Sequence, residues 1–231
     1  MRNIYCGIAD IRKRVFAEVA KLAYEGGDYH RIDKLPYEIL PGEVGNERDS
    51  IFLERAIVGE RIRLAMGHSL RSASEQGLLS DGVDKSAVRE KYYEPPLINI
   101  IKYACHACPD THYEVTNACQ SCLAHHCSNS CPKGAISFRY GRAEIDQSKC
   151  IKCGKCKAAC SYQAIIRFER PCQEACGMDA ISSDENGKAD IDYDKCVSCG
   201  QCLVNCPFGA IADKSQIFQT IRAIQSGEKV Y

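Results

Sequence analysis

The cysteines are distributed so unevenly that they divide the chain in two. Of 17 cysteines in 231 residues, 16 lie between Cys105 and Cys206, and the first 104 residues contain only Cys6. Many are separated by only two or three residues, so the second half must fold around whatever these thiols bind. The N-terminus has no apolar segment typical of a secretory signal, so disulfides are disfavoured and metal binding is the favoured interpretation.

Two runs of cysteines share the spacing Cys-x2-Cys-x2-Cys-x3-Cys, one from Cys150 to Cys160 and one from Cys196 to Cys206. This is the bacterial ferredoxin spacing, in which three thiolates of a tight loop bind one 4Fe–4S cubane and the fourth binds the neighbouring cluster. The small residues Gly154 and Gly200 suit such a loop. A variant run, with four residues between its second and third cysteines, extends from Cys119 to Cys131.

The second half of the chain is also an internal repeat. The unit Cys-x3-Ala-Ile occurs four times, beginning at Cys131, Cys160, Cys176 and Cys206. Segments 143–150 and 189–196 match each other, and a turn precedes each, at Gly141 in one copy and Gly187 in the other. A strand, a tight turn and a second strand are therefore expected twice. The repeat predicts two modules, each with a hairpin and a short helix that follows a cysteine cluster.

The repeat divides the sixteen cysteines into four sets, because each ferredoxin run gives its last cysteine to the other cluster. The first module supplies a first set, Cys119, Cys122, Cys127 and Cys160, and a second set, Cys131, Cys150, Cys153 and Cys156. The second module supplies a third set, Cys176, Cys196, Cys199 and Cys202. The fourth set takes the remaining cysteines, Cys105, Cys108, Cys172 and Cys206. Three 4Fe–4S clusters follow from the cysteine spacing. The fourth is a hypothesis that rests on the number of cysteines and on their positions within the repeat.

Other roles for these residues stay open. The pairs Cys105-x2-Cys108 and Cys119-x2-Cys122 together resemble a zinc ribbon, and the first pair could also have no ligand role. Cys6 is expected to be a small buried apolar residue. The cysteine count leaves no vacancy for a histidine ligand, so surface positions or hydrogen bonds to cluster sulfur are expected for His106, His112, His125 and His126.

The first half of the chain predicts helices at about 11–25, 46–66 and 84–93. Apolar side chains recur at helical spacing from Ile11 to Leu22, with Asp10 as the expected N-cap. Nothing in this half assembles a catalytic group, so its expected role is packing against the second half or a partner. Arg61 and Arg63 are expected on a solvated helix face.

The predicted fold class is α+β, with a helical N-terminal domain followed by two tandem ferredoxin-like two-cluster modules. The expected boundaries are 1–100 for the helical domain, 101–166 for the first module and 167–213 for the second. Residues 214–231 are expected to form a C-terminal helix and then the start of a linker or strand that continues into further chain or a partner sheet.

Several function classes are disfavoured by composition. The formal net charge is zero, with 30 basic and 30 acidic residues, which gives no indication of nucleic acid or an anionic membrane as partner. No run of 18 apolar residues predicts a membrane span. Glycine-rich motifs for nicotinamide, flavin or ATP are absent from the sequence. The pattern is typical of an electron conductor without a catalytic centre, and we expect it in the cytoplasm.

Three segments narrow the interpretation further: Tyr5–Ile8, Pro171–Ile181 and Ser226–Tyr231. With the double ferredoxin module, they resemble the N-terminal region of monomeric iron-only (FeFe) hydrogenases of the group B type found in anaerobes, over most of the chain. In that family, accessory clusters feed electrons to a C-terminal catalytic domain, whose signature motifs this sequence lacks. The resemblance implies the electron-transfer part of a hydrogenase, whose partner is the missing catalytic domain or another redox protein.

Two rival interpretations remain. The longer spacing between Cys122 and Cys127 also resembles the four-cluster electron-transfer subunits of molybdopterin oxidoreductases, and a stand-alone polyferredoxin would carry the same runs. A cluster-based redox or oxygen sensor, with the helical half as its output, is the third hypothesis.

Overall fold

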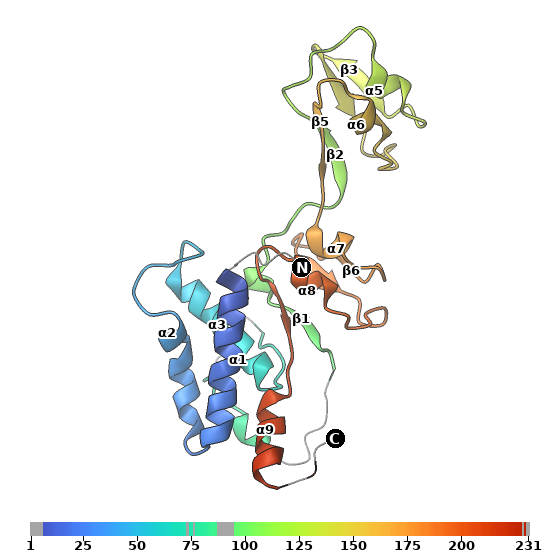
Figure 1. The fold of residues 1–231 in the computed structure, drawn as a ribbon. Helices are drawn as coiled ribbons and strands as arrows, with labels where there is room; N and C mark the ends of the chain where they lie inside the picture. Colours follow the sequence, from blue (N-terminus) through green and yellow to red (C-terminus); the bar gives the residue numbers. More distant parts are fainter. Residues whose placement is uncertain (1–6, 73, 76, 87–94, 228, 230–231) are drawn as a thin grey trace.

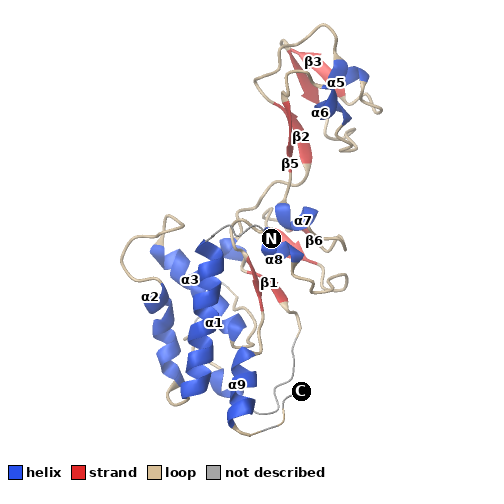
Figure 2. Cartoon of the chain, in the orientation of Figure 1, coloured by secondary structure: helices blue, strands red, loops and turns tan. Residues whose placement is uncertain are grey.

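The computed structural model of the chain describes residues 7–72, 74–75, 77–86, 95–227 and 229. Long helices occupy the first half, whereas short strands and single-turn helices occupy most of the second (Figures 1 and 2). The fold is thus a mixture of helix and strand, in line with the predicted α+β class. Among the described helices, none is both long and apolar enough to cross a lipid bilayer.

The helical half begins with a long helix and ends with a short one. Its elements are α1 (Gly7–Glu25), the 3₁₀ helix η1 (Tyr29–Lys34), α2 (Leu35–Ile39), α3 (Ile51–Ala65) and α4 (Val83–Ser86). Asp10 lies in the first turn of α1 rather than at its N-cap, so that detail of the prediction is wrong. The helix predicted at 84–93 begins at Val83, and its continuation beyond Ser86 lies outside the described residues, as does Cys6.

Helix α3 starts five residues later than predicted. The side chain of Ser50 caps it by accepting a hydrogen bond from the backbone N–H of Leu53 at 3.3 Å. Residues 46–48 form a loop around Glu54 instead, and their three backbone N–H groups donate to its carboxylate at 2.6–3.2 Å. Glu54 is buried, so these bonds replace the water that the carboxylate loses. Periodicity alone does not reveal this loop.

The core of the helical half includes the far end of the chain. Val15 and Val19 of α1, Ile62 of α3 and Phe218 are all buried in one apolar cluster. Phe218 belongs to α9 (Ile217–Gln225), which lies beside α1 in Figure 1. Residues 214–227 thus return to the helical half, and the strand expected at the very end falls outside the described residues except for Lys229.

Four two-stranded antiparallel sheets account for the described strands. The pairs are β1 (Ile98–Ile100) with β8 (Ile211–Asp213), β2 (His112–Val115) with β5 (Ile165–Phe168), β3 (Ile136–Arg139) with β4 (Arg142–Ile145), and β6 (Ile181–Ser183) with β7 (Ala189–Ile191). The 3₁₀ helix η2 (Lys102–Ala104) and the short helices α5 (His126–Asn129), α6 (Lys155–Ala159), α7 (Pro171–Glu174) and α8 (Gln201–Asn205) lie between them. Both predicted hairpins are present, as β3–β4 and β6–β7.

The strand pairs are nested rather than consecutive. The ribbon β2–β5 encloses β3–β4, and β1–β8 encloses all of these together with β6–β7. We call residues 111–168 the distal unit, and residues 98–110 with 169–213 the proximal unit. Figure 1 shows the distal unit at the end of the β2–β5 ribbon, farthest from the helices. This nesting differs from the expected boundaries at 101 and 167, because β1 pairs with a strand more than 100 residues away.

The helical half packs on the proximal unit through apolar and charged contacts. Ile57 and Leu64 of α3 are buried together with Ile101 and Ala210. Arg12 forms an ion pair with Asp213 of β8 at 2.6 Å. Arg61 is only 7% exposed and donates a hydrogen bond to the carbonyl of Gly209, so the prediction of a solvated position for Arg61 is wrong. Packing of the first half against the second is therefore what the structure shows.

We expect Phe218→Ala to destabilise the protein by about 3–5 kcal/mol, because it removes a fully buried ring that meets the Tyr29 ring edge to face at 5.6 Å. Ile224→Ala is the matched control, since it shortens a side chain of the same helix that is 60% exposed. Thermal unfolding of the cluster-loaded protein checks the difference. Equal melting temperatures for the two variants would contradict the packing of α9 described above.

Candidate iron-sulfur sites

The first Cys-x2-Cys loop of each set, which begins at Cys105, Cys119, Cys150 or Cys196, has the same backbone turn. The residue just before the second cysteine has a positive φ in each loop, 48° at Ala107, 46° at Ser121, 57° at Lys152 and 55° at Ser198. Side chains other than glycine's are disfavoured there by about 1–2 kcal/mol. Four such residues at one motif position indicate a shared constraint, since turns of this kind create concave backbone sites for anionic groups, including iron–sulfur centres.

One cysteine of each set is the second residue of a short helix and is buried. These residues are Cys127 in α5, Cys156 in α6, Cys172 in α7 and Cys202 in α8. Gly154 and Gly200 precede two of the helices with φ of 76° and 77°, the conformation expected for a tight wrap. His125 takes the same place before α5 with φ of 44°.

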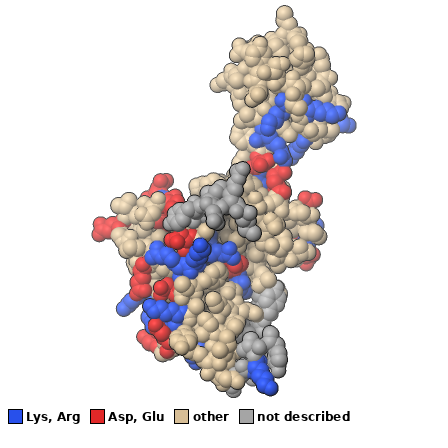
Figure 3. Space-filling view, in the orientation of Figure 1, with Lys and Arg blue, Asp and Glu red and all other residues tan. Residues whose placement is uncertain are grey.

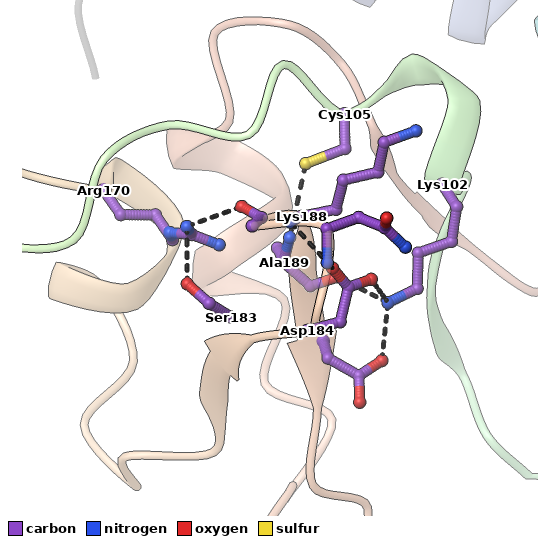
Figure 4. A network of polar contacts seen from close by, with 10 residues as sticks. Lys102, Cys105, Arg170, Ser183, Asp184, Lys188 and Ala189 are labelled. Carbon is purple, nitrogen blue, oxygen red and sulfur yellow. Dashed lines mark hydrogen bonds and ion pairs between the residues drawn. The ribbon is translucent and has the colours of Figure 1, made fainter.

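In three of the four Cys-x3-Ala-Ile units, the turn that follows donates a hydrogen bond to the first cysteine. The backbone N–H of the alanine donates to the sulfur at 3.3 Å for Cys131, 3.4 Å for Cys160 and 3.3 Å for Cys176. Two sulfurs accept from more distant segments, Cys119 from Ala143 at 3.5 Å and Cys105 from Ala189 at 3.4 Å (Figure 4). N–H donors of this kind stabilise negative charge on sulfur.

Cysteines of the first and second sets lie together in the distal unit. Cys127 and Cys156 are in one buried cluster with Cys119, Cys131 and Cys160 around them. Burial raises the pKa of the Cys127 thiol, and the neighbouring Cys160 and Cys119 raise it further. Burial also raises the pKa of Cys156, and its interacting thiols are Cys150 and Cys131. The neighbours of each buried thiol are thus those that the repeat groups with it.

The proximal unit gives the same result for the third set. Burial raises the pKa of Cys202 to about 11, with further contributions from Cys196, Cys176 and Cys199. These four cysteines also line one cavity.

The fourth set is assembled from the most distant segments. Burial raises the pKa of Cys172 to about 11, and its interacting thiols are Cys206, Cys105 and Cys108. All four line a second cavity in the proximal unit. Sequence reasoning supported this set least, because its members span about 100 residues. Cys122 and Cys153 are the only two cysteines of the four sets not yet placed. Each is the last residue of a Cys-x2-Cys loop whose first cysteine, Cys119 or Cys150, belongs to the same set.

The cysteine pairs of the zinc-ribbon alternative lie in different units. Cys105 contacts the apolar cluster of the proximal unit, whereas Cys119 contacts that of the distal unit. Across the described ranges, no three Cys, His, Asp or Glu side chains are grouped closely enough to hold a single metal ion. A cubane differs from such an ion because its four thiolates surround a body of eight atoms.

The histidines near the cysteines stack mainly on phenylalanine rings. His106 stacks on Phe208 with 4.0 Å between ring centroids, and His125 stacks on Phe138 at 3.8 Å. His112 likewise stacks on Phe168, and His126 is exposed. Arg48 lies 3.2 Å from the Nε2 atom of His106.

Sequence reasoning missed a buried arginine beside the fourth set. Arg170 is 2% exposed and donates through Nη2 to the Cys108 carbonyl at 2.5 Å, the Ser183 hydroxyl at 2.8 Å and the Gly187 carbonyl at 2.9 Å (Figure 4). Its Nε and Nη1 atoms are buried with no hydrogen-bond partner in the structure as described, and the residue lines the cavity of the fourth set. Cluster sulfides are acceptors that suit these groups, so the site fits a bound cluster. The only sequence signal is its position two residues before Cys172.

A second cation joins the start of the proximal unit to its inner hairpin. The ammonium group of Lys102 forms ion pairs with Asp184 at 2.9 Å and Asp190 at 2.7 Å, and it donates to the Ala189 carbonyl at 2.8 Å (Figure 4). These bonds hold η2, which directly precedes Cys105, against the hairpin that supplies the N–H group to the Cys105 sulfur.

Comparison with known proteins agrees with this geometry. Residues 142–165 match the model of a 4Fe-4S binding domain, and residues 166–217 match that of the LdpA Fe-S cluster-binding domain. The two matches are adjacent and together include most of both regular ferredoxin runs. They define the chain as an iron–sulfur protein with 4Fe–4S clusters as its cofactors.

The chain is also similar to curated proteins over part of its length. It is 34% identical over 76 residues to the electron transport protein HydN of Escherichia coli, which covers 33% of this chain and 39% of that protein. It is 40% identical over 53 residues to a probable iron-sulfur subunit of the Frd operon of Proteus vulgaris, covering 23% and 34%. It is 51% identical over 39 residues to one component of the ion-translocating oxidoreductase complex of Methanosarcina acetivorans, covering 17% and 15%. The chain therefore spans less than two fifths of the length of each of these relatives.

We expect Arg170→Met to destabilise the protein by about 3–5 kcal/mol, because it removes a buried guanidinium and leaves two half-buried carbonyls and a hydroxyl without their donor. Arg167→Met is the matched control, since Arg167 forms ion pairs with Glu169 and Glu174 that are exposed to solvent and contribute little to stability. Thermal unfolding of the cluster-loaded proteins measures both. A smaller loss for Arg170→Met than for its control would contradict a structural role for the buried guanidinium.

Proposed function

We propose that the chain transfers electrons through four 4Fe–4S clusters held by the four cysteine sets, in two ferredoxin-like units of which one is inserted into the other. The observation that carries the proposal is the repeated backbone geometry. Each set combines a Cys-x2-Cys loop with a left-handed residue and a buried cysteine at the start of a helix. The loop at Cys105 and Cys108 has this geometry although it belongs to no regular run, which supports counting the fourth set with the others.

The cysteines leave no position open for a substrate. Four thiolates saturate the protein's share of a cubane, and a cluster bound in this way supplies one-electron transfer without bond chemistry. The donated cysteines also keep successive sites close together. Cys160 directly follows the loop and helix that hold the second set, yet its thiol interacts with Cys127 of the first set. Cys206 likewise follows the loop and helix of the third set, and its thiol interacts with Cys172 of the fourth set. The chain is therefore suited to conduct electrons and not to consume a substrate.

The proposed redox partner follows from the sequence resemblance and from the relatives. The resemblance to iron-only hydrogenases makes the catalytic part of such an enzyme the proposed partner, in an anaerobic cytoplasm. The second candidate is an electron-transfer subunit of another oxidoreductase, or a stand-alone polyferredoxin. It is supported by relatives whose names describe an electron transport protein and a component of an oxidoreductase complex. Reading the coding sequence beyond Tyr231 separates the two, since a continuation with hydrogenase cysteine motifs favours the first.

The experiment that tests the function is a count of iron and acid-labile sulfide after anaerobic reconstitution, with EPR of the reduced protein. We expect about sixteen iron atoms per chain and spin-coupled spectra. About twelve iron atoms, with or without one zinc ion, would contradict the fourth site and leave the other three.

We expect Cys105→Ser to lower the iron content from about sixteen to about twelve atoms per chain, because it removes a ligand of the fourth set only. Cys6→Ser is the control, since Cys6 is the one cysteine outside the four sets. An unchanged iron content in Cys105→Ser would count against the fourth set.

We expect Cys160→Ser to damage the site of Cys119, Cys122 and Cys127 and to spare the site of the loop that precedes Cys160. The reason is that the Cys160 thiol interacts with Cys127, whereas the interacting thiols of Cys156 are Cys150 and Cys131. EPR of the variant, compared with that of Cys122→Ser and Cys153→Ser, identifies the lost signal. A spectrum that matches Cys153→Ser would show that the ligation is not crossed.

A further inference from the structure

The two units carry opposite charge although they repeat one architecture. The distal unit has eight Lys and Arg residues against three Asp and Glu, whereas the proximal unit has four against ten. A neutral chain therefore contains a strongly polarised second half. In Figure 3, basic side chains gather on the flank of the distal unit and acidic ones lie at the neck below it, whereas both kinds are spread over the rest of the molecule.

The positive charge is concentrated at one cluster loop. Lys149, Lys152, Lys155 and Lys157 flank or separate the cysteines of the second set, and all four are exposed. Lys149 is paired with Asp146 at 3.3 Å. Within the described part of the chain, no salt bridge involves Lys152, Lys155 or Lys157. Three ammonium groups without a salt bridge therefore surround this loop.

The equivalent loop of the proximal unit provides an internal comparison. Ser198, Gln201 and Leu203 occupy the positions that correspond to Lys152, Lys155 and Lys157. Its single lysine, Lys195, is paired with Asp192 at 2.8 Å. Backbone conformation is the same in both loops, since Lys152 and Ser198 share a positive φ and both helices follow a left-handed glycine. The lysines are therefore not required by the shape of the loop.

The lysine-rich loop also exposes the groups that an electron-transfer interface needs. Cys153 is exposed, so the edge of this site reaches the surface. Ile151, which lies between Lys149 and Lys152 in sequence, is 54% exposed and offers an apolar contact within this basic segment. Weak redox complexes bury little area, and charge complementarity sets their association rate and orientation.

We infer that the lysine-rich loop of the distal unit is the docking site for a small acidic one-electron carrier protein. This inference rests on the proposed electron-transfer function and identifies where the external carrier binds. In the step, the reduced carrier loses one electron and the distal unit gains it, with no bond formed or broken and no proton transferred. The acidic proximal unit repels the same carrier and so directs it to the distal end.

The test uses the cluster-loaded chain and a reduced acidic bacterial two-cluster ferredoxin as the probe, mixed anaerobically in a stopped-flow instrument. We compare the triple variant Lys152→Gln/Lys155→Gln/Lys157→Gln with Val197→Glu/Gln201→Glu/Val204→Glu. Both lower the charge by three, the second at exposed positions of the equivalent proximal loop. Reduction by methyl viologen radical, a small cation, serves as the reference for intact clusters.

We expect the second-order rate constant with ferredoxin to fall roughly ten- to a hundredfold in the lysine variant at low ionic strength, and less than about threefold in the control. The difference should shrink as salt is added, because screening removes the steering. The rate with methyl viologen should not fall in either variant, because the loss of positive charge favours the approach of a cation.

Equal losses in the two variants, or a ferredoxin rate that is independent of salt, would overturn the docking site. Salt-sensitive binding of a single-stranded oligonucleotide that the lysine variant abolishes, without any loss of ferredoxin rate, would assign the loop to nucleic acid instead. A wild-type chain that neither reductant reduces would refute the electron-transfer function itself, so the two failures are distinguishable.

Discussion

Every cysteine set depends on a thiol from a segment that is distant in sequence, and this requirement shapes the second half of the molecule. A compact loop can bring three cysteines together by itself, but the fourth must be delivered by chain that returns after a strand, a turn and a second strand. Antiparallel hairpins provide this return twice, in β3–β4 between Cys131 and Cys150 and in β6–β7 between Cys176 and Cys196. The strands are only three or four residues long, so their hydrogen bonds alone give little stability. Under the proposed ligation, cysteines on both sides of each hairpin would bind the same clusters, which supplies a reason for such small sheets to persist.

The helical half has a different part in the architecture. It buries its own apolar core and then covers the face of the proximal unit that carries β8, through Arg12, Arg61 and the residues around Ile57. Because α9 continues directly from β8 and packs on α1, the proximal unit is held between two segments of one helical body. The distal unit has no comparable support among the described residues and extends from the ribbon (Figure 1). Rigid attachment at one end and open surface at the other agree with a conductor that has one fixed and one exchangeable contact.

The features that could be predicted from the sequence, such as the hairpin turns and the grouping of cysteines, are those that neighbouring residues determine. The turn at Tyr140 and Gly141 forms a two-residue hairpin because both residues adopt positive φ, and Gly187 lies in the corresponding turn of the second copy. The grouping of cysteines could be proposed because equivalent cysteines have the same positions in both copies of the repeat. Pairing of β1 with β8 could not be read in this way, since both strands are three-residue segments without a register signal. The burial of Arg61 and Arg170 was equally invisible, because only the folded chain shows which carbonyl groups are left for a guanidinium to satisfy.

The nesting of the two units has a consequence for how such a chain can change in evolution. His112 and Phe168 are directly opposite each other at the base of the ribbon, so the distal unit enters and leaves the proximal unit at almost one point. A short turn at this point would close the proximal unit without disturbing its strands. The distal unit can thus be inserted or removed as one piece without changing the attachment to the helical body. Under the proposed function, this would lengthen or shorten the electron path by one pair of sites.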